Sequence, residues 1–75
     1  MISTDTAIIS DAKSFGQALK RRRKELHYTQ AYISEFTGFS TSFISELENG
    51  KETAELEKAL YLASLLGLNF FLEKR

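Results

Sequence analysis

The sequence predicts a small, mainly α-helical domain, and two observations carry the prediction. Apolar residues recur at intervals of three and four along most of the 75-residue chain, which is the spacing of one helix face. The central stretch, residues 29–50 (TQAYISEFTGFSTSFISELENG), reads as two short helices joined by a tight turn. Residues suited to cap or end a helix stand at its boundaries: Thr29, Gly38, Ser40 or Thr41, and Asn49-Gly50. Two helices of about two turns each with so short a turn have the helix-turn-helix format, whose second helix enters the DNA major groove.

The composition fits one small domain without a cofactor. A chain of 75 residues buries only about 60% of its unfolded surface, so its core is thin and oligomerisation would help it. Cysteine is absent, which excludes a disulfide framework and a thiolate metal site and is compatible with a reducing cytoplasm. The single histidine provides too few nitrogen ligands for zinc. We therefore predict neither a metal nor a cofactor.

No targeting or catalytic pattern stands out. Residues 1–11 have no basic segment followed by a long apolar run, so we predict no signal peptide. No apolar run approaches the roughly 20 residues that span a bilayer, and we expect a soluble cytoplasmic protein without a membrane partner. His27 is isolated, no glycine-rich phosphate loop is present, and no spacing of serine, histidine and acid builds a triad. We therefore expect no enzyme and name no catalytic residue.

The charge is polarised although the net charge is zero. Residues 12–30 carry six basic residues against Glu25 alone, whereas acidic residues predominate before and after them. This cluster is either an electrostatic footprint for nucleic acid or a solvated helix face. The run Lys20–Lys24 spans more than one helical turn, so its members cannot share a face. Arg22 and Arg23 lie nearest the apolar stripe, and one of them is expected to make a structural ion pair.

The first helix is expected to begin between Asp11 and Ser14 and to end at Leu26. Ser14 followed by Gln17 fits a capping box at its start. Helical spacing puts three large apolar residues on its inward face: Phe15, Leu19 and Leu26.

The second and third helices are expected to cover Gln30–Thr37 and Thr41–Glu48. By helical spacing their inward residues are Ile33 and Phe36 in the second helix and Ile44 and Leu47 in the third. Phe39 is too large and apolar for an open turn, so we place it in the angle between these two helices. The third helix then keeps an exposed polar face that comprises Thr41, Ser42, Ser45 and Glu46.

The fourth helix is expected to begin with Thr53 as N-cap and to end at Gly67. Its predicted inward stripe consists of Leu56, Ala59, Leu60, Ala63 and Leu66. Tyr61, Leu62 and Leu65 widen the apolar surface beyond that stripe. So broad an apolar surface in a small domain is typical of a helix with a second partner.

Residues 68–75 (LNFFLEKR) read as a strand that has nothing to pair with in an all-helical domain. Two copies around a two-fold axis would pair these edges and cover the exposed part of the fourth helix. The alternative is a disordered tail, which the run Phe70-Phe71-Leu72 disfavours. The expected dimerisation residues are Leu65, Leu68, Phe70, Phe71 and Leu72. The chain is thus divided into an arm or short edge strand (1–10, with the strand at Ala7 to Ser10), a helical domain (11–67) and a dimerisation strand (68–75).

The segment LHYTQAYISEFTGFSTSFISELENGKETAELEKALYLASLLGL resembles the Cro/lambda-repressor type of helix-turn-helix family, and the resemblance covers residues 14–67. Within that family, SFISELENGKETAELEKALYLASLLGLNFFL is most similar to the HipB-type antitoxins. The resemblance implies a lambda-repressor-like domain of four or five helices, a homodimer joined by the C-terminal strand, and a palindromic operator in double-stranded DNA. It also implies a transcriptional repressor that regulates its own operon and binds a HipA-type Ser/Thr kinase toxin.

The resemblance also assigns roles to individual residues. Base edges would be read by Thr41, Ser42 and Glu46, with Ser45 beside them. Phosphates would be bound by Gln30 at the start of the second helix and by Asn49 and Lys51 after the third. The basic cluster would add phosphate contacts from Lys20 and Arg22. Arg23 and Glu48 match a buried structural ion pair, which agrees with the place of Arg23 beside the apolar stripe.

Some positions depart from the family pattern, which usually has Ala at Ser34, Val at Phe39 and Pro at Glu52. More important, the reading positions hold no arginine or glutamine, whose bidentate base contacts discriminate by about 1–3 kcal/mol each. Specificity would then rest on Glu46 as an acceptor from cytosine, on thymine methyl contacts and on operator shape. Two alternatives stay open: a stand-alone or phage-type repressor, and a protein-interaction module that has lost DNA binding.

Overall fold

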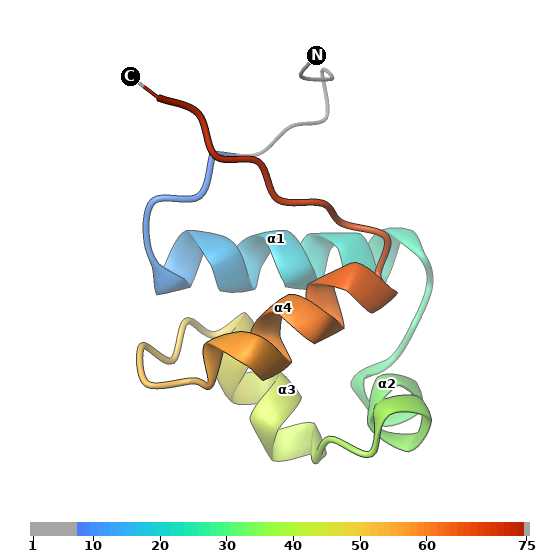
Figure 1. The fold of residues 1–75 in the computed structure, drawn as a ribbon. Helices are drawn as coiled ribbons and strands as arrows, with labels where there is room; N and C mark the ends of the chain where they lie inside the picture. Colours follow the sequence, from blue (N-terminus) through green and yellow to red (C-terminus); the bar gives the residue numbers. More distant parts are fainter. Residues whose placement is uncertain (1–7, 75) are drawn as a thin grey trace.

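The computed structural model describes residues 8–74 and contains four α-helices in this range (Figure 1). They are α1 (Ala12–Glu25), α2 (Gln30–Thr37), α3 (Thr41–Glu48) and α4 (Leu56–Leu65). None of the described residues belongs to a strand, so the predicted mainly α-helical fold is confirmed. No helix in this part of the chain is long and apolar enough to cross a membrane. Part of the predicted arm and its edge strand, residues 1–7, lies outside the described residues.

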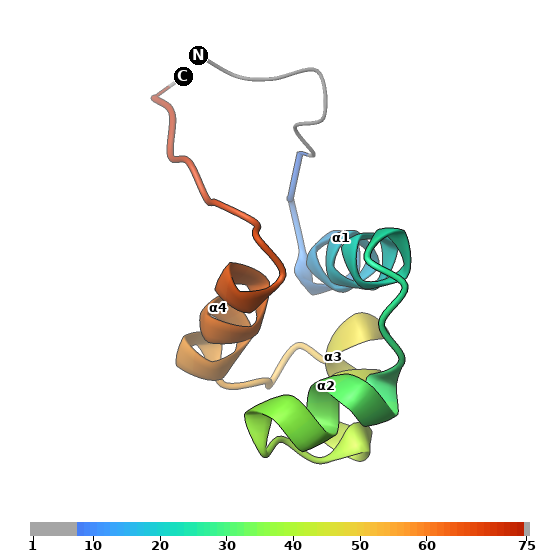
Figure 2. The same ribbon diagram turned by 90° about the vertical axis from the view of Figure 1, so that its right-hand side faces the viewer.

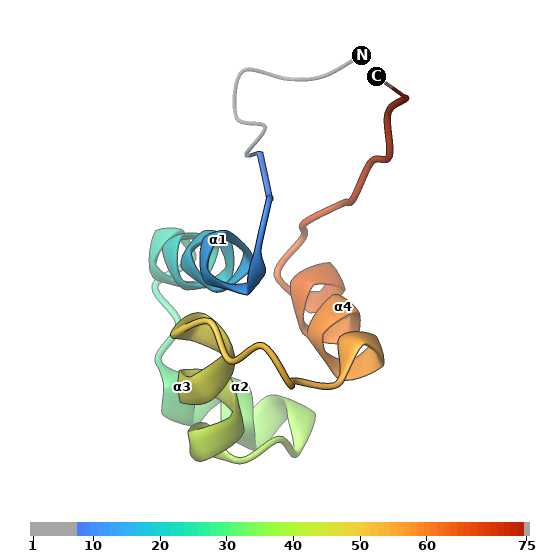
Figure 3. The same cartoon turned by 90° about the vertical axis from the view of Figure 1, so that its left-hand side faces the viewer.

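The core lies between α3, α1 and α4. α3 packs against both α1 and α2 (Figures 1 and 2). Figure 3, in which the left-hand side of Figure 1 faces the viewer, shows the loop that carries the chain from the end of α3 to the start of α4. Leu19, Ile44 and Leu62 are the largest fully buried side chains, and each comes from a different one of these helices. The rest of the core consists of Ile33, Leu47, Ala59, Ala63 and Leu66.

α1 starts with Asp11 as its N-cap. The Asp11 carboxylate accepts a hydrogen bond from the Ser14 N–H at 2.7 Å, and Ser14 Oγ accepts one from the Asp11 N–H at 3.1 Å. The predicted capping box of Ser14 with Gln17 is therefore wrong, because Ser14 is the third helical residue of a box that Asp11 opens. The hydrogen bonds from Ser14 lower the pKa of the Asp11 carboxyl group, since they favour its charged form.

α2 and α3 have the predicted bounds, and their caps are the predicted hydroxyl residues. Thr29 Oγ1 accepts a hydrogen bond from the Tyr32 N–H at 3.0 Å, and Ser40 Oγ accepts one from the Phe43 N–H at 3.0 Å. Gly38 ends α2 with a φ of 80°, a left-handed conformation that a residue with a Cβ rarely adopts. The turn between the helices therefore follows from local chemistry.

The inward placement of Phe36 is wrong, because this side chain is 65% exposed. Ile33 is the buried residue of this 8-residue helix, and the core does not extend to the position of Phe36. Its ring instead stacks on Tyr32, with centroids 6.4 Å apart. Tyr32 in turn lies 4.9 Å from the ring of Tyr28. The three rings form one aromatic cluster that runs from the loop before α2 along the helix.

Phe39 in the turn connects α3 to α4. Its ring lies 5.1 Å from Phe43 and 6.0 Å from Tyr61, both in edge-on geometry. The sequence pattern places this ring between α2 and α3, whereas its two aromatic partners lie on α3 and α4. The helix-turn-helix unit is thereby attached to the rest of the domain through its turn.

α4 starts later and is rotated relative to the prediction. Thr53 lies in the loop, and the N-cap is Glu55, which makes no capping hydrogen bond with its side chain. Leu62 is 1% exposed, whereas Leu56 and Leu60 are 69% and 39% exposed. The inward stripe is Ala59, Leu62, Ala63 and Leu66. Ala59 and Ala63 belong to both stripes, so spacing alone allows either one, and the packing of α4 against the core selects the stripe with Leu62.

Residues 68–74 are neither helical nor paired as a strand within the chain. Leu68 packs half-buried against the core, and the ring of Phe70 lies 5.5 Å from that of Phe15 in α1. Phe71 and Leu72 are 66% and 102% exposed. A strand needs a partner edge, so pairing in a dimer stays a prediction for this segment.

Candidate nucleic-acid interface

The outer face of α3 presents short polar side chains. Thr41, Ser42 and Glu46 are exposed and Ser45 is half-buried. Ile44 and Leu47 of the same helix are 0% and 3% exposed and hold it against the core. The four predicted base-reading residues therefore share the solvent side of a helix whose other side is fixed by packing.

Behind this face, Arg23 of α1 and Glu48 of α3 form a buried bidentate ion pair. Arg23 Nε and Nη2 donate to the two carboxylate oxygens of Glu48 at 2.6 and 3.0 Å. Arg23 Nη1 also donates to the Tyr28 carbonyl at 2.8 Å. The hydrogen bond with Glu48 raises the pKa of Arg23. The structure thus brings together the two residues expected to pair and joins α1, α3 and the loop that leads into α2.

Gln30 extends this network to α2. Its Nε2 donates to Glu48 Oε1 at 3.1 Å, so the side chain points toward the ion pair. A primary amide carries two N–H donors, and one of them is left for a phosphate at the start of α2. The predicted phosphate contact of Gln30 stays a prediction, and the structure adds a second role in orienting Glu48.

Two further predicted phosphate-binding residues, Lys51 and Asn49, each contact a predicted base-reading residue in the free protein. Lys51 Nζ lies 2.6 Å from Glu46 Oε2, and both side chains are about half exposed, at 47% and 48%. Asn49 Nδ2 donates to Ser45 Oγ at a longer distance of 3.4 Å. A predicted phosphate-binding residue therefore lies beside a predicted base-reading residue in both cases.

Arg22 has a structural role that its predicted phosphate contact does not include. Its Nε donates to the Leu66 carbonyl at 2.8 Å, and its Nη1 lies 3.4 Å from Glu25. Leu66 is the C-cap of α4, where helix carbonyls lack intrahelical partners, so Arg22 caps α4, and its phosphate contact stays a prediction. In the sequence, the position of Arg22 beside the apolar stripe of α1 indicates such a structural role. Lys20 is exposed on α1, and its phosphate contact stays a prediction.

The sequence reasoning missed Gly16, where the backbones of α1 and α3 lie close together. A Cβ on this residue would lie 2.3 Å from the Leu47 carbonyl oxygen and 2.6 Å from that of Glu48. Such distances are far below van der Waals contact, so only glycine fits while the helices stay in place. A glycine inside an amphipathic helix pattern was the available signal.

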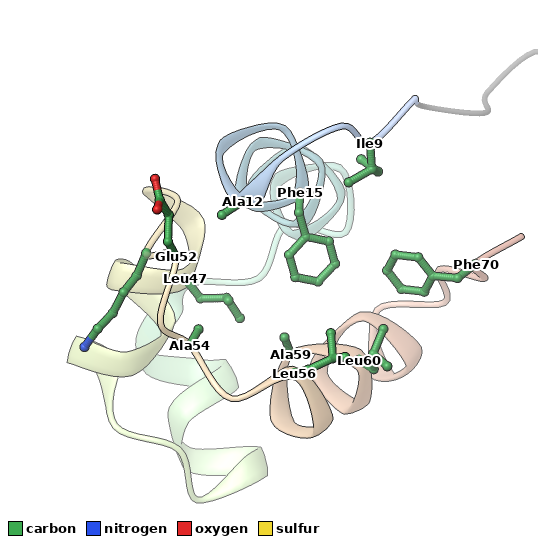
Figure 4. A pocket seen from close by; sticks show the side chains of 11 residues that line it. Ile9, Ala12, Phe15, Leu47, Glu52, Ala54, Leu56, Ala59, Leu60 and Phe70 are labelled. Carbon is green, nitrogen blue, oxygen red and sulfur yellow. The ribbon is translucent and has the colours of Figure 1, made fainter. Parts of the chain in front are cut away.

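An apolar groove of about 320 Å³ lies between the start of α1, α4 and the tail. Figure 4 shows Phe15 and Phe70 facing each other across it, with Leu60 on α4 below them. The predicted dimerisation residues Leu65, Phe70, Phe71 and Leu72 are all exposed, and Leu68 is half-buried. The structure therefore leaves apolar surface on α4 and the tail. Within residues 8–74, no three His, Asp or Glu side chains lie together as a metal site would require.

The fold and the outer face of α3 define the helix-turn-helix class of DNA-binding regulators. The helix-turn-helix family model matches residues 19–71, and the chain belongs to that family. The ImmF control region 10 kDa protein of Bacillus phage phi105 is 30% identical over 59 residues. The match covers 79% of this chain and 66% of that relative, just under two thirds of its length.

Two solved structures share the fold. One is described as a HipB-O4 20mer complex, with a TM-score of 0.81 and 22% identity. The other is a complex of a HipB variant with an O2 20mer, with a TM-score of 0.83 and 23% identity. The matches cover 92% and 93% of this chain and 97% of each HipB chain. The expected lambda-repressor-like fold of the HipB type is thereby confirmed.

Proposed function

We propose that this protein is a sequence-specific transcriptional repressor that binds double-stranded DNA as a homodimer. The observation that carries the proposal is the polar outer face of α3, held rigidly from behind by the buried Arg23–Glu48 pair. A helix that is exposed on one side and fixed on the other can enter a major groove without losing its position. We expect no catalytic activity.

Contacts to phosphate and to bases are divided between different parts of this surface. We assign phosphate binding to Gln30 at the start of α2, to Asn49 and Lys51 after α3, and to Lys20 on α1. We assign base contacts to Thr41, Ser42, Ser45 and Glu46. Phosphate contacts provide most of the affinity and set the register, whereas base contacts decide between sequences.

The test is selection of bound duplexes from a pool of random 20-base-pair DNA, followed by affinity measurements over a range of salt concentrations. We expect a two-fold symmetric consensus and an affinity that falls with salt by a slope near −0.9 per phosphate neutralised. Failure to enrich any sequence, or binding that ignores salt, would support the alternative of an interaction module that has lost DNA binding.

Glu46→Ala is expected to change the preferred base at one position of each half-site. The carboxylate can only accept hydrogen bonds, and the base donor that carboxylates usually contact in the major groove is the cytosine N4 amine, so alanine removes that preference. The measurement is the same selection repeated with the variant. Glu35→Ala is the matched control, because Glu35 is an exposed acid on α2. An unchanged consensus with Glu46→Ala would remove this residue from the reading set.

The homodimer is proposed because the apolar surface of α4 and the tail is unpartnered within the described part of the chain. Leu65, Phe71 and Leu72 are exposed at 36%, 66% and 102%. A dimer that pairs the tails would hold two weakly discriminating α3 faces at a fixed distance, which matches a palindromic operator.

Deletion of residues 68–75 is expected to weaken dimerisation and operator binding together. Burying one Phe or Leu side chain is worth about 1.5–3 kcal/mol, so even Phe71→Ser should raise the dimer dissociation constant by roughly tenfold or more. Phe71 is exposed in the monomer, so this variant tests the interface without disturbing the core. Analytical ultracentrifugation is the measurement. A fully dimeric truncation at micromolar concentration would refute the pairing of the tails.

Two biological settings suit such a repressor. An antitoxin that binds a HipA-type kinase and regulates its own operon is supported by the HipB-like Leu47–Lys51 segment and by the fold shared with the HipB structures. A phage-type repressor is supported by the 30% identity to the phage phi105 control-region protein. Co-expression with a HipA-type kinase separates them: a stable complex favours the antitoxin, and its absence favours the phage-type regulator.

A further inference from the structure

Glu46 and Lys51 are brought together by the backbone at the end of α3. Asn49 is the C-cap, Gly50 has a φ of 88°, and the Lys51 N–H donates to the Glu46 carbonyl at 3.0 Å. The Gly50 N–H donates to the Leu47 carbonyl at 3.1 Å, which completes a Schellman motif. The motif returns Lys51 to the side of the helix that carries Glu46. The side-chain contact of 2.6 Å between them is therefore a consequence of how the helix ends.

The two side chains have opposite effects on DNA. A carboxylate at a major-groove surface repels phosphates, whereas an ammonium attracts them, and the two charges cancel while they are paired. Both side chains are about half exposed, at 48% for Glu46 and 47% for Lys51. An exposed ion pair of this kind shifts an equilibrium by at most about fivefold, so a competing partner can open it.

We propose that the Glu46–Lys51 pair is a latch that couples base identity to phosphate contact, an inference that rests on the proposed DNA-binding function. On DNA without a cytosine amine in reach, the pair stays closed and Lys51 neutralises no phosphate. At a cognate site the cytosine N4 amine donates a hydrogen bond to the Glu46 carboxylate. Lys51 is thereby released, and its ammonium group binds a phosphate. Lys51 is therefore a specificity residue although it touches no base, and this compensates for the absence of arginine and glutamine on the reading face.

Salt dependence tests the latch. Affinities are measured for a duplex selected from a random 20-base-pair pool and for an unselected duplex, with wild type, Lys51→Met and Glu46→Gln. For Lys51→Met we expect the salt slope on the selected duplex to become shallower by about 0.9, with the slope on the unselected duplex unchanged. For Glu46→Gln we expect the slope on the unselected duplex to become steeper by about 0.9, because Lys51 is freed there.

Lys58→Met is the matched control. Lys58 is 48% exposed and lies 3.6 Å from Glu55, so it is a paired surface lysine of the same exposure located on α4. Its replacement should change neither slope. Melting of each variant without DNA confirms folding, and a double-mutant cycle of Glu46→Gln with Lys51→Met should give a coupling of up to about fivefold in the folding equilibrium.

Three other outcomes would contradict the proposed latch. If Lys51→Met lowers both slopes equally, Lys51 binds phosphate on all DNA, and the latch fails while the proposed DNA-binding function stands. If the two substitutions are additive in the free protein, the pair is not populated in solution. If wild type binds neither duplex, the latch and the proposed function fail together.

Discussion

Arg23→Ala is expected to lower the free energy of unfolding by about 3–5 kcal/mol, because it leaves a buried carboxylate without its partner. Glu48 is only 5% exposed and accepts both bonds of the bidentate pair, and the Tyr28 carbonyl also loses a donor. Domains of 75 residues are stable by roughly 4–11 kcal/mol, so the loss is a large share of the total. The melting temperature of the DNA-free protein should fall by at least about 10 °C, measured by circular dichroism.

Arg21→Ala is the control for this prediction, because Arg21 is an exposed arginine of the same helix. Its replacement should change the free energy of unfolding by no more than about 0.5 kcal/mol. A double variant, Arg23→Met with Glu48→Met, should regain much of the lost stability, since neither charge is then buried alone. Equal melting temperatures for Arg21→Ala and Arg23→Ala would contradict a structural role for the pair.

Gly16→Ala is expected to destabilise the protein, although helix propensity favours the change by about 1 kcal/mol. The added Cβ would lie 2.3 Å from the Leu47 carbonyl oxygen and 2.6 Å from that of Glu48. Both atoms are backbone, so α1 and α3 must separate, and overpacking of this kind costs about 1–3 kcal/mol. At such short distances the steric cost exceeds the propensity gain, and we expect a net loss of up to about 2 kcal/mol.

Urea denaturation measures this loss, and DNA affinity should fall with it because α3 is displaced. Gln17→Ala is the matched control, since Gln17 is the next residue of α1 and is exposed. Its effect should stay within about 0.5 kcal/mol. A Gly16→Ala protein as stable as wild type would mean that α1 and α3 do not approach each other closely at this position.

The predictions that succeeded rest on interactions between residues close together in the chain. The bounds of α2 and α3 follow from caps in which Thr29 and Ser40 bind amides three residues later, and from Gly38, whose backbone conformation ends α2. These hydrogen bonds need no tertiary partner, so the residue types suffice to place them. The Arg23–Glu48 pair is not local, and it was expected only because periodicity and family resemblance agreed.

Apart from the local caps of α1 and α4, the predictions that failed or were incomplete concern residues whose environment is set by another helix. Arg22 belongs to a basic run that suggests phosphate binding, and only the structure shows that it also caps α4 through the Leu66 carbonyl. Phe36 falls near the inward face of α2 but finds no core there, and Leu60 and Leu62 exchange places because two apolar stripes on α4 are nearly equivalent. Periodicity identifies which faces are apolar, but not which one meets a partner.

The sequence by itself determined the helix-turn-helix unit, the polar composition of its outer face and the presence of a second apolar surface, because capping, turn formation and binary pattern are local properties. Only the tertiary structure decided that Gly16 sets the spacing of α1 and α3 and that Arg22 serves α4. These facts depend on where separate helices and loops come within a few ångströms of one another. Such distances are settled by packing of the whole core, to which every helix contributes.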